Sequence, residues 1–430
     1  MRKSLVAAAF VASTVVLASC AMPADDPNFN VEAMDEGIEP GLAEENAADQ
    51  VAMEDAFLPP TSLGIDTPLT APPASGASLV SLTDGTEYQG VFESSLVEAA
   101  EVLGWTVDTL TVDTADPVAV ETAFAEALAK APSGIHITGT MVDSLSEGLA
   151  SAEAAGIPVV CTGCSTSAAI PGITDSSING TDQNLEWADV LASYVVASQF
   201  EGEDAGVQII ALPGTGYAEF NSQFANTLLD QCRNCSSSET FLDPFMVDVA
   251  DSASVASFIA SEMSMALGSW ALLDSGAISD TVADTLATDP TLLSPVTVIG
   301  RGASSADIQA LIALDGAAPA DAGAEGDPGE MTTEGDAVAE ADGDFTELGG
   351  RTPEEAAALQ AWVGISQPIM AWRVVDQFAR ILGGEATVVG PIPSQFLTAT
   401  NVAEAVLDAS GNYLGVADYK EQFAALWGIQ

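Results

Sequence analysis

Five cysteines and one histidine are the side chains of this 430-residue chain best suited to bind metals or to carry redox chemistry. Four of the cysteines form two C-x-x-C pairs, Cys161/Cys164 and Cys232/Cys235. The 67 residues between the pairs do not match the spacing of a zinc finger or a zinc ribbon. Neither pair has the sequence context of a thioredoxin-like redox centre. Disulfides are the remaining use of these thiols in an exported protein, and three connectivities are open at this point.

The histidine, His136, lies between Ile135 and Ile137 in an apolar run, which is typical of a residue in the core or on a sheet face. The sequence shows no nucleophile with a base at a recognisable spacing. We therefore expect no enzymatic activity, no metal and no cofactor. Gly214 and Gly216 lie between a predicted strand and a predicted helix, but the full fingerprint of a nucleotide-binding loop is absent. We expect this loop to place a helix N-terminus at a cleft.

The elements that position these residues begin with a regular alternation over residues 77–164. Apolar and β-branched runs predict strands at 77–82, 105–112, 134–138 and 156–160. Apolar residues spaced by three and four predict helices between them, with Pro117 in a first turn and Gly104 at an end. Strands that alternate with helices of this length predict right-handed βαβ units on a parallel sheet.

The same alternation returns after residue 180. Strands are predicted at 206–212, 240–242, 269–273, 295–299, 359–364 and 397–401. Helices are predicted at 185–200, 217–231, 253–267, 277–287, 305–314, 368–382 and 419–427. The pattern therefore predicts a second α/β lobe that resembles the first.

The run Ala152-Glu-Ala-Ala-Gly-Ile-Pro-Val-Val160 resembles the type I periplasmic binding proteins, the ribose- and galactose-binding type of solute receptor. The resemblance continues in order over about residues 77–430. It includes a run from Trp372 to Glu385 that is similar to the last crossover helix of that family, and runs at 390–393 and 397–401 that are similar to its third crossing strand. The resemblance implies an α/β fold of two doubly wound parallel-sheet lobes, joined by three crossings and closing on a solute.

The N-terminus has the pattern of an export signal. Arg2 and Lys3 precede an apolar run that ends near Leu17 and is too short to remain as a membrane span. The run closes with Leu17-Ala-Ser-Cys20, which resembles a bacterial lipobox and implies lipidation of Cys20; the alternative is an ordinary signal peptide with a chance cysteine. We expect an extracytoplasmic protein that a lipid anchors to the cell membrane.

These features divide the chain. We expect a lipoprotein signal peptide at 1–20, a disordered acidic tether at 21–76 and a disordered acidic insertion at 317–350, because neither acidic segment has an apolar period. The N-terminal lobe comprises residues 77–179 plus 367–390. The C-terminal lobe comprises residues 180–366 plus 391–430.

Charge excludes one class of partner. The chain has 9 Lys and Arg against 63 Asp and Glu, a formal net charge of −54 at pH 7. Nucleic acid is excluded because a polyanion needs basic residues to neutralise its phosphates. A high-salt habitat, which screens self-repulsion, is one explanation of the acidity, and unstructured acidic segments are another. The segments 21–76 and 315–350 carry 12 and 11 of the acidic residues, so 40 remain on the rest of the chain.

In doubly wound sheets a ligand lies beyond the C-terminal ends of the strands. In the resembled family these positions face the solute, and they carry here Asp84, Tyr88, Thr140, Thr162, Tyr217, Asp274, Arg301 and Gln367. The chain departs from typical sugar binders, which carry Asp-Arg where Gly163-Cys164 stands, Asn-Asp where Asp274-Ser275 stands, and Asp near Gly302. We expect the ligand to be a sugar or a similar polar solute.

The expected lobes also bear on the cysteines. The two C-x-x-C pairs fall in different lobes that should move relative to one another, so we expect local bridges, Cys161–Cys164 and Cys232–Cys235. The family resemblance suggests that the second bridge is a staple between a helix and a strand.

The resemblance implies capture of a small molecule outside the membrane and delivery to the permease of an ABC importer. The expected partners are the solute, the permease and the membrane, and the protein is expected to be a monomer. The alternative is a lipid-anchored sensor that presents the solute to a membrane receptor. A transcription regulator of similar fold would need a basic helix-turn-helix and no lipobox.

Substitution of Cys20 by serine should release the protein from membranes, because the thiol that accepts the lipid is lost. Cell fractionation followed by immunoblotting measures the distribution. A Cys20→Ser protein that stays with the membrane fraction like the parent would refute lipid anchoring.

Overall fold

The computed structural model describes residues 55–165, 169–199, 205–211, 218–241, 252–265, 269–276, 278, 296–315 and 353–429. All of them belong to one compact unit, Ala48–Gln430. The predicted signal peptide, Cys20, residues 21–54 of the tether, Tyr217 and the insertion at 317–350 lie outside the described residues.

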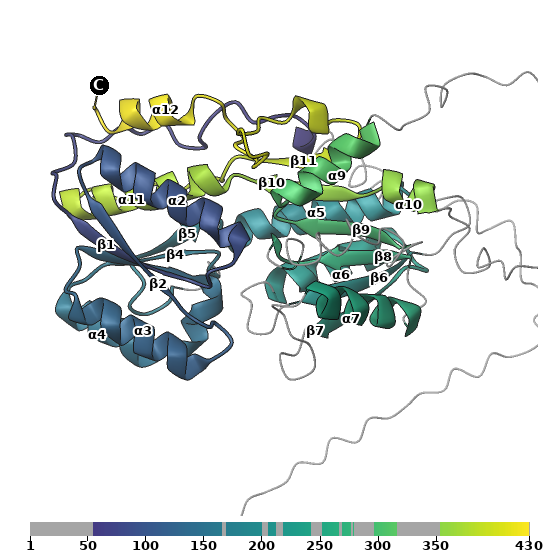
Figure 1. Ribbon diagram of the computed structural model, residues 1–430, viewed down its shortest axis with the longest axis horizontal. Coiled ribbons are helices and arrows are strands. Elements are labelled where there is room, and N and C mark those ends of the chain that lie inside the picture. Colours follow the sequence, from purple (N-terminus) through teal and green to yellow (C-terminus); the bar gives the residue numbers. More distant parts are fainter. Residues whose placement is uncertain are drawn as a thin grey trace, which may run out of the picture. The chain divides into compact units, whose positions relative to one another are not determined.

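Five strands form the first sheet in the order β2-β1-β3-β4-β5, and every neighbouring pair is parallel. The strands are β1 (Ser78–Thr83), β2 (Thr106–Thr111), β3 (Gly134–Thr138), β4 (Val159–Thr162) and β5 (Asp175–Ile178). Helices α3 (Pro117–Ala129) and α4 (Ser146–Ala155) cover one face, and α2 (Glu87–Val102) and α11 (Gln367–Gly383) cover the other (Figure 1). The predicted parallel sheet is confirmed.

Local capping explains where these helices begin and end. The Thr86 side chain accepts a hydrogen bond from the backbone N–H of Gln89 and caps the start of α2. The Asp116 side chain accepts from the backbone N–H of Val118 and caps α3, whose first residue is Pro117. Helix α4 ends at Gly156, whose φ of 69° suits glycine.

Six strands form the second sheet in the order β11-β10-β9-β8-β6-β7. They are β6 (Gly206–Ala211), β7 (Ser236–Phe241), β8 (Trp270–Leu273), β9 (Thr297–Arg301), β10 (Ala361–Ile365) and β11 (Ser394–Thr398). The remaining described helices are α5 (Thr181–Ala197), α6 (Ala218–Gln231), α7 (Ser252–Met265), α9 (Ser305–Asp315), α10 (Pro353–Ala358) and α12 (Tyr419–Leu426). The chain passes between the sheets after β5, after β10 and after α11. The predicted α/β architecture of two parallel-sheet lobes is therefore confirmed.

Three strands differ from the sequence prediction. β7 begins at Ser236, four residues before the predicted strand at 240–242. β5 lies in a segment that reads as turns, since its residues are mostly polar, and it forms because it extends the ladder of β4. β11 begins three residues before the predicted strand and runs antiparallel to β10, so the third crossing ends in an edge strand of the second sheet.

Three apolar clusters hold these layers together. One lies between the first sheet and α3 and α4, and another lies on one face of the second sheet against α7 and α9. The third and largest is continuous across both sheets and contains much of α2, α5, α6 and α11. The two sheets therefore share a core instead of packing independently.

Helix α11 lies inside this shared core, and every residue from Gln367 to Arg380 is buried. Its charges are compensated internally: Arg380 Nε donates to Asp376 Oδ2 at 2.8 Å, and Trp427 Nε1 donates to Asp376 Oδ1 at 3.0 Å. Arg373 Nη2 donates to the Gly390 carbonyl at 2.9 Å. A buried ion pair of this kind is stable only because such hydrogen bonds satisfy both charges.

Residues 55–76 correct the predicted tether, because they pack on the folded unit. Leu63 is fully buried, and its carbonyl accepts from Arg373 Nη1 at 3.3 Å. The Thr67 carbonyl accepts from Arg380 Nη2 at 2.6 Å. An extended segment leaves its backbone carbonyls unsatisfied, and the arginines of α11 supply the donors.

The C-terminal helix α12 also departs from the expected lobe assignment, because it packs on α11. Trp427 stacks on Trp372 with ring centroids 5.2 Å apart, and Lys420 pairs with Glu98 of α2. Its apolar face is drawn to the large aromatic surface of α11, which lies against the first sheet.

Replacement of Arg380 by methionine should cost about 3–5 kcal/mol of unfolding free energy, because Asp376 is left as a buried charge without its cation. Replacing Asp376 by leucine in the same chain should recover part of the loss. Urea denaturation at pH 7 measures both.

The matched control is Lys130→Met, which removes a surface cation that lies 2.7 Å from Asp108 and 3.2 Å from Glu126. Exposed pairs contribute little, so the urea midpoint should barely move. A loss at Arg380 no larger than that at Lys130 would contradict the role given to the buried pair.

Candidate functional site

The turn between β1 and α2 places the first predicted ligand residues. Asp84 Oδ1 accepts from the backbone and from the hydroxyl of Thr86, at 2.9 and 2.8 Å. Gly85 has a φ of 75°, which lets the chain reverse into the helix. The Asp84 carboxylate is thus engaged in shaping the turn, and Tyr88 is set in the first turn of α2.

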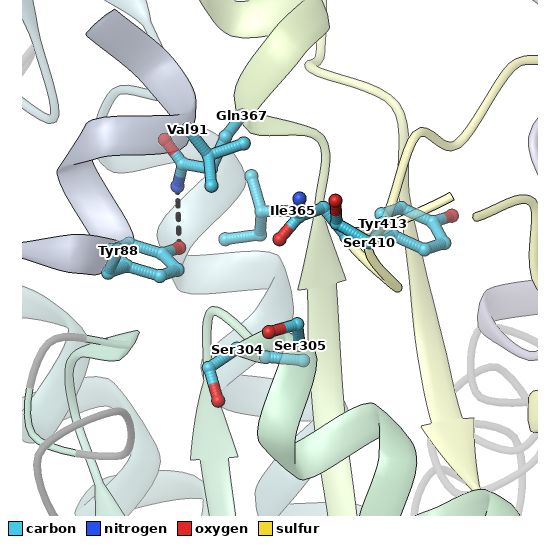
Figure 2. Close-up of a pocket in the computed structure, with 10 residues that line it drawn as sticks. Tyr88, Val91, Ser304, Ser305, Ile365, Gln367, Ser410 and Tyr413 are labelled. Carbon is cyan, nitrogen blue, oxygen red and sulfur yellow. Dashed lines mark hydrogen bonds between the residues drawn. The ribbon is translucent and has the colours of Figure 1, made fainter. Parts of the chain in front are cut away.

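Tyr88 reaches the ends of two strands of the second sheet. A Cβ atom on Gly276, after β8, would lie 2.5 Å from Cε2 of Tyr88, and one on Gly302, after β9, would lie 2.5 Å from its hydroxyl oxygen. The two glycines therefore form a slot that any larger residue would close. The Tyr88 hydroxyl accepts from Gln367 Nε2 at 2.5 Å, so the structure brings two of the predicted site residues together (Figure 2).

A cavity of about 280 Å³ adjoins this hydrogen bond (Figure 2). Tyr88 and Val91 of α2 form one wall, and Ile365 and Gln367 form another. The remaining wall comes from two loops of the second sheet and contains Ala303, Ser304, Ser305, Ser410, Asn412 and Tyr413. These residues are neutral, and they mix hydroxyl and amide groups with apolar surface.

Asp274 and Arg301 lie deeper than predicted. Both are buried within the second sheet and its helices, and neither lines this cavity. The Arg301 guanidinium lies 5.3 Å from the centre of the Phe220 ring, and Asp274 Oδ2 accepts from Asn221 Nδ2 at 3.2 Å. Their role as ligand residues stays a prediction.

Thr140 and Thr162 belong to the first sheet and are also apart from Tyr88. Thr140 and Thr138 share a hydroxyl hydrogen bond of 2.8 Å in the 3-10 helix that follows β3. Thr162 is buried, and its hydroxyl lies 3.1 Å from His136 Nε2. The structure thus groups Tyr88 with Gln367 and leaves Asp84, Thr140 and Thr162 in separate local networks.

The sequence reading missed the network around His136. Ser81 Oγ lies 2.8 Å from His136 Nδ1 and donates to Glu93 Oε1 at 2.9 Å. Because the Ser81 proton goes to Glu93, the neutral imidazole with Nδ1 protonated fits, with Nε2 accepting from Thr162. Ser81 and His136 are register partners on β1 and β3, so a correct pairing of these strands would have revealed the contact.

Burial controls the protonation of this network. Desolvation lowers the pKa of His136 from 6.5 to about 3. Burial also raises the pKa of Glu93, although the hydrogen bond from Ser81 opposes the shift. A neutral, buried imidazole that is packed 4.9 Å from the Phe92 ring is a core residue, as the sequence predicts.

No family model and no curated protein matches the sequence. Solved structures do match. An ABC sugar transporter subunit from Rhodobacter sphaeroides is 14% identical over 75% of this chain and 98% of its own, with a TM-score of 0.54. An ABC transporter solute-binding protein from Agrobacterium vitis with bound allitol is 16% identical over 77% and 98%, also with a TM-score of 0.54.

The chain has the type I periplasmic-binding-protein fold. A protein from Bacteroides fragilis that is assigned as a LacI transcriptional regulator matches as well, at 11% identity over 77% of this chain and all of its own, with a TM-score of 0.53. At such identities the likeness establishes the fold alone.

The binding-protein fold contains both predicted local disulfides. Cys161–Cys164 closes the end of β4, and Cys232–Cys235 joins the end of α6 to the start of β7, with Cα atoms 5.9 and 5.3 Å apart. Within the described residues no group of three or more His, Cys, Asp or Glu side chains could hold a metal ion. None of the described helices combines the length and the apolar character that a membrane span requires.

His136 should make the binding-protein fold sensitive to acid. Its folded-state pKa lies below that of the unfolded chain, so between pH 6.5 and about 3 the unfolded state binds a proton that the folded state does not. Its stabilisation is complete above the unfolded pKa and is lost as pH falls through this window, by up to about 1.4 kcal/mol per pH unit.

The variant His136→Gln keeps a donor and an acceptor but cannot titrate. Urea denaturation from pH 7 to pH 4 should show the parent losing stability relative to this variant on acidification. No second histidine can contribute, because the chain has only one. Parallel stability curves for the two proteins would show that His136 does not titrate differently on unfolding.

Proposed function

We propose that the protein is an extracytoplasmic solute-binding protein, anchored by a lipid on Cys20, that captures a small polar molecule and delivers it to an ABC importer. The observation that carries the proposal is the junction of Tyr88, Gly276, Gly302 and Gln367, where strand ends of the second sheet meet α2 from the first, beside a cavity lined by polar and apolar residues. A site built from two sheets can couple solute binding to their relative position.

The physical basis of such a receptor is differential contact. A solute favours the closed arrangement only if it touches groups from both sides, because a ligand shifts an equilibrium by its difference in affinity between the two states. The cavity meets this requirement, since Tyr88 and Val91 come from α2 and Ser304 and Ser305 from α9 and its preceding loop. The permease would then recognise the closed form.

The chemical class of the solute is supported by proteins of the same fold. The Agrobacterium vitis protein holds allitol, and a carbohydrate transporter solute-binding protein from Agrobacterium radiobacter holds D-arabinose. A sugar or a similar polar solute is therefore the first candidate here. The alternative of a DNA-binding regulator is disfavoured by the net charge of −54, which repels nucleic acid.

The test is a thermal-shift screen of the purified protein with allitol, D-arabinose, other sugars and polyols, nucleosides and amino acids. A solute at 100 times its dissociation constant should stabilise the folded state by about 2.7 kcal/mol and raise the melting temperature. Small-angle X-ray scattering should show a smaller radius of gyration with the solute bound. No stabilisation by any compound of the screen would overturn the proposed function.

Gln367→Ala should weaken binding of the solute found in this way about two- to tenfold, the worth of one neutral hydrogen bond. Gln422→Ala is the matched control, because Gln422 lies on α12 and bonds only Asp418 of its own helix start among the described residues. Titration calorimetry compares the two variants, and equal affinities would remove Gln367 from the site.

A further inference from the structure

The side chain of Tyr88 covers the strand ends of the second sheet from the opposite lobe. Gly276 follows β8 and Gly302 follows β9, and the two glycines adjoin, because a Cβ atom on Gly302 would lie 3.3 Å from the Gly276 nitrogen. The same Cβ atom would lie 2.5 Å from the Tyr88 hydroxyl oxygen, and one on Gly276 would lie 2.6 Å from Cζ of the ring. Tyr88 therefore packs directly on both glycines, at the edge where a doubly wound sheet binds ligands.

The far end of the Tyr88 ring is fixed by a hydrogen bond. Gln367 Nε2 donates to the Tyr88 hydroxyl at 2.5 Å (Figure 2). Gln367 is the first residue of α11 and is 7% exposed, so the donor is held by the buried start of that helix. A tyrosine combines a large apolar contact with a polar tip that needs a partner, and both requirements are met here.

A second contact joins the lobes through another pair of elements. Ser165, beyond the end of β4 in the first sheet, donates from Oγ to Glu219 Oε1 and Oε2 at 3.3 and 3.2 Å. Glu219 lies in the first turn of α6 in the second lobe, and its Oε2 also accepts from Thr181 Oγ1 at 2.8 Å. Because Thr181 begins α5 of the same lobe, one carboxylate takes hydrogen bonds from both sides.

The two contacts exist in only one arrangement of the lobes. Tyr88 and Ser165 follow β1 and β4 of the first sheet, and their partners Gly276, Gly302 and Glu219 belong to the second lobe. A rotation about the crossings separates both sets of partners. Contacts that are made in one state and lost in the other shift the equilibrium between the two states, whether they come from a ligand or from the chain itself.

We propose that these two contacts form an intramolecular latch, in which side chains of the chain itself hold the lobes together and Tyr88 is the principal element. Closure then does not require a solute. A solute that reaches the strand ends has to displace the Tyr88 ring, so the latch is autoinhibitory. Because the latch belongs to the chain alone, its test needs no solute and its outcome is independent of the proposed function.

Double electron–electron resonance between two spin labels measures the separation of the lobes. Val118 of α3 and Asn226 of α6 are exposed, and their substitution by cysteine gives one label site in each lobe. The full chain carries Cys20→Ser as well, because the other four cysteines are bound in disulfides and do not take a label. With no solute added, the parent should give mainly the label distance of the arrangement described above.

Tyr88→Ala should raise the ratio of separated to joined lobes at least about tenfold, because the ring contact and the hydrogen bond are both lost. Tyr88→Phe keeps the ring and loses the hydroxyl, so its shift should have the same direction and a smaller size. Gln89→Ala, a truncation at the next position of α2 that does not line the cavity, is the matched control and should match the parent. Circular dichroism and melting temperatures establish that the variants fold.

A second pair of variants tests the contact at Glu219. Ser165→Ala removes hydrogen bonds that cross between the lobes, and Thr181→Ala removes one inside the second lobe at the same carboxylate. Ser165→Ala should raise the separated fraction, and Thr181→Ala should leave it unchanged. Equal shifts in these two variants would overturn the part given to Ser165. A parent with mainly separated lobes, or the same distances in the parent, Tyr88→Phe and Tyr88→Ala, would overturn the latch.

Discussion

The structure depends on a helix that is buried on every side and therefore has to neutralise its own charges. In α11, Asp376 receives Arg380 and the indole of Trp427, while Arg373 and Arg380 donate to three backbone carbonyls of other segments. Burial lowers the pKa of Arg373 to about 10, so it remains a cation at neutral pH. One helix thus fixes the segment at 55–76, the third crossing and α12 at once.

These contacts use cations that the chain has in short supply. Of the six basic residues that the structure describes, three, Arg301, Arg373 and Arg380, are buried. Buried cations do not neutralise acidic side chains on the surface. The surface therefore carries a larger excess of negative charge than the composition alone implies. Repulsion between exposed carboxylates weakens as salt shortens the screening length, to about 3 Å at 1 M. The high-salt hypothesis is consistent with this distribution.

Sequence patterns predicted the helices and strands in which apolar residues recur at a regular spacing. They did not predict structure that depends on contacts with residues far away in the chain. The strands and helices of residues 77–164 follow from apolar spacing, and both local disulfides follow from the separation of the C-x-x-C pairs. The packing of residues 55–76 could not be predicted, because the carbonyls of Leu63 and Thr67 need donors from arginines about 310 residues away. The contact of Tyr88 with Gly276 and Gly302 likewise depends on how the two sheets meet, which no local pattern encodes.

The packed segment at 55–76 has a mechanical consequence. Its beginning is held by the second sheet, where Gln395 and Asn401 donate to the Phe57 carbonyl at 2.9 and 3.1 Å. Its end is held by the first, where Trp105 donates to the Ala74 carbonyl at 2.7 Å. The segment is therefore a strap laid across both halves, a fourth connection beside the three covalent ones. A force applied to the chain N-terminal to Asp55 would act first on β11. A rotation of one half against the other has to pivot near this strap or break its hydrogen bonds.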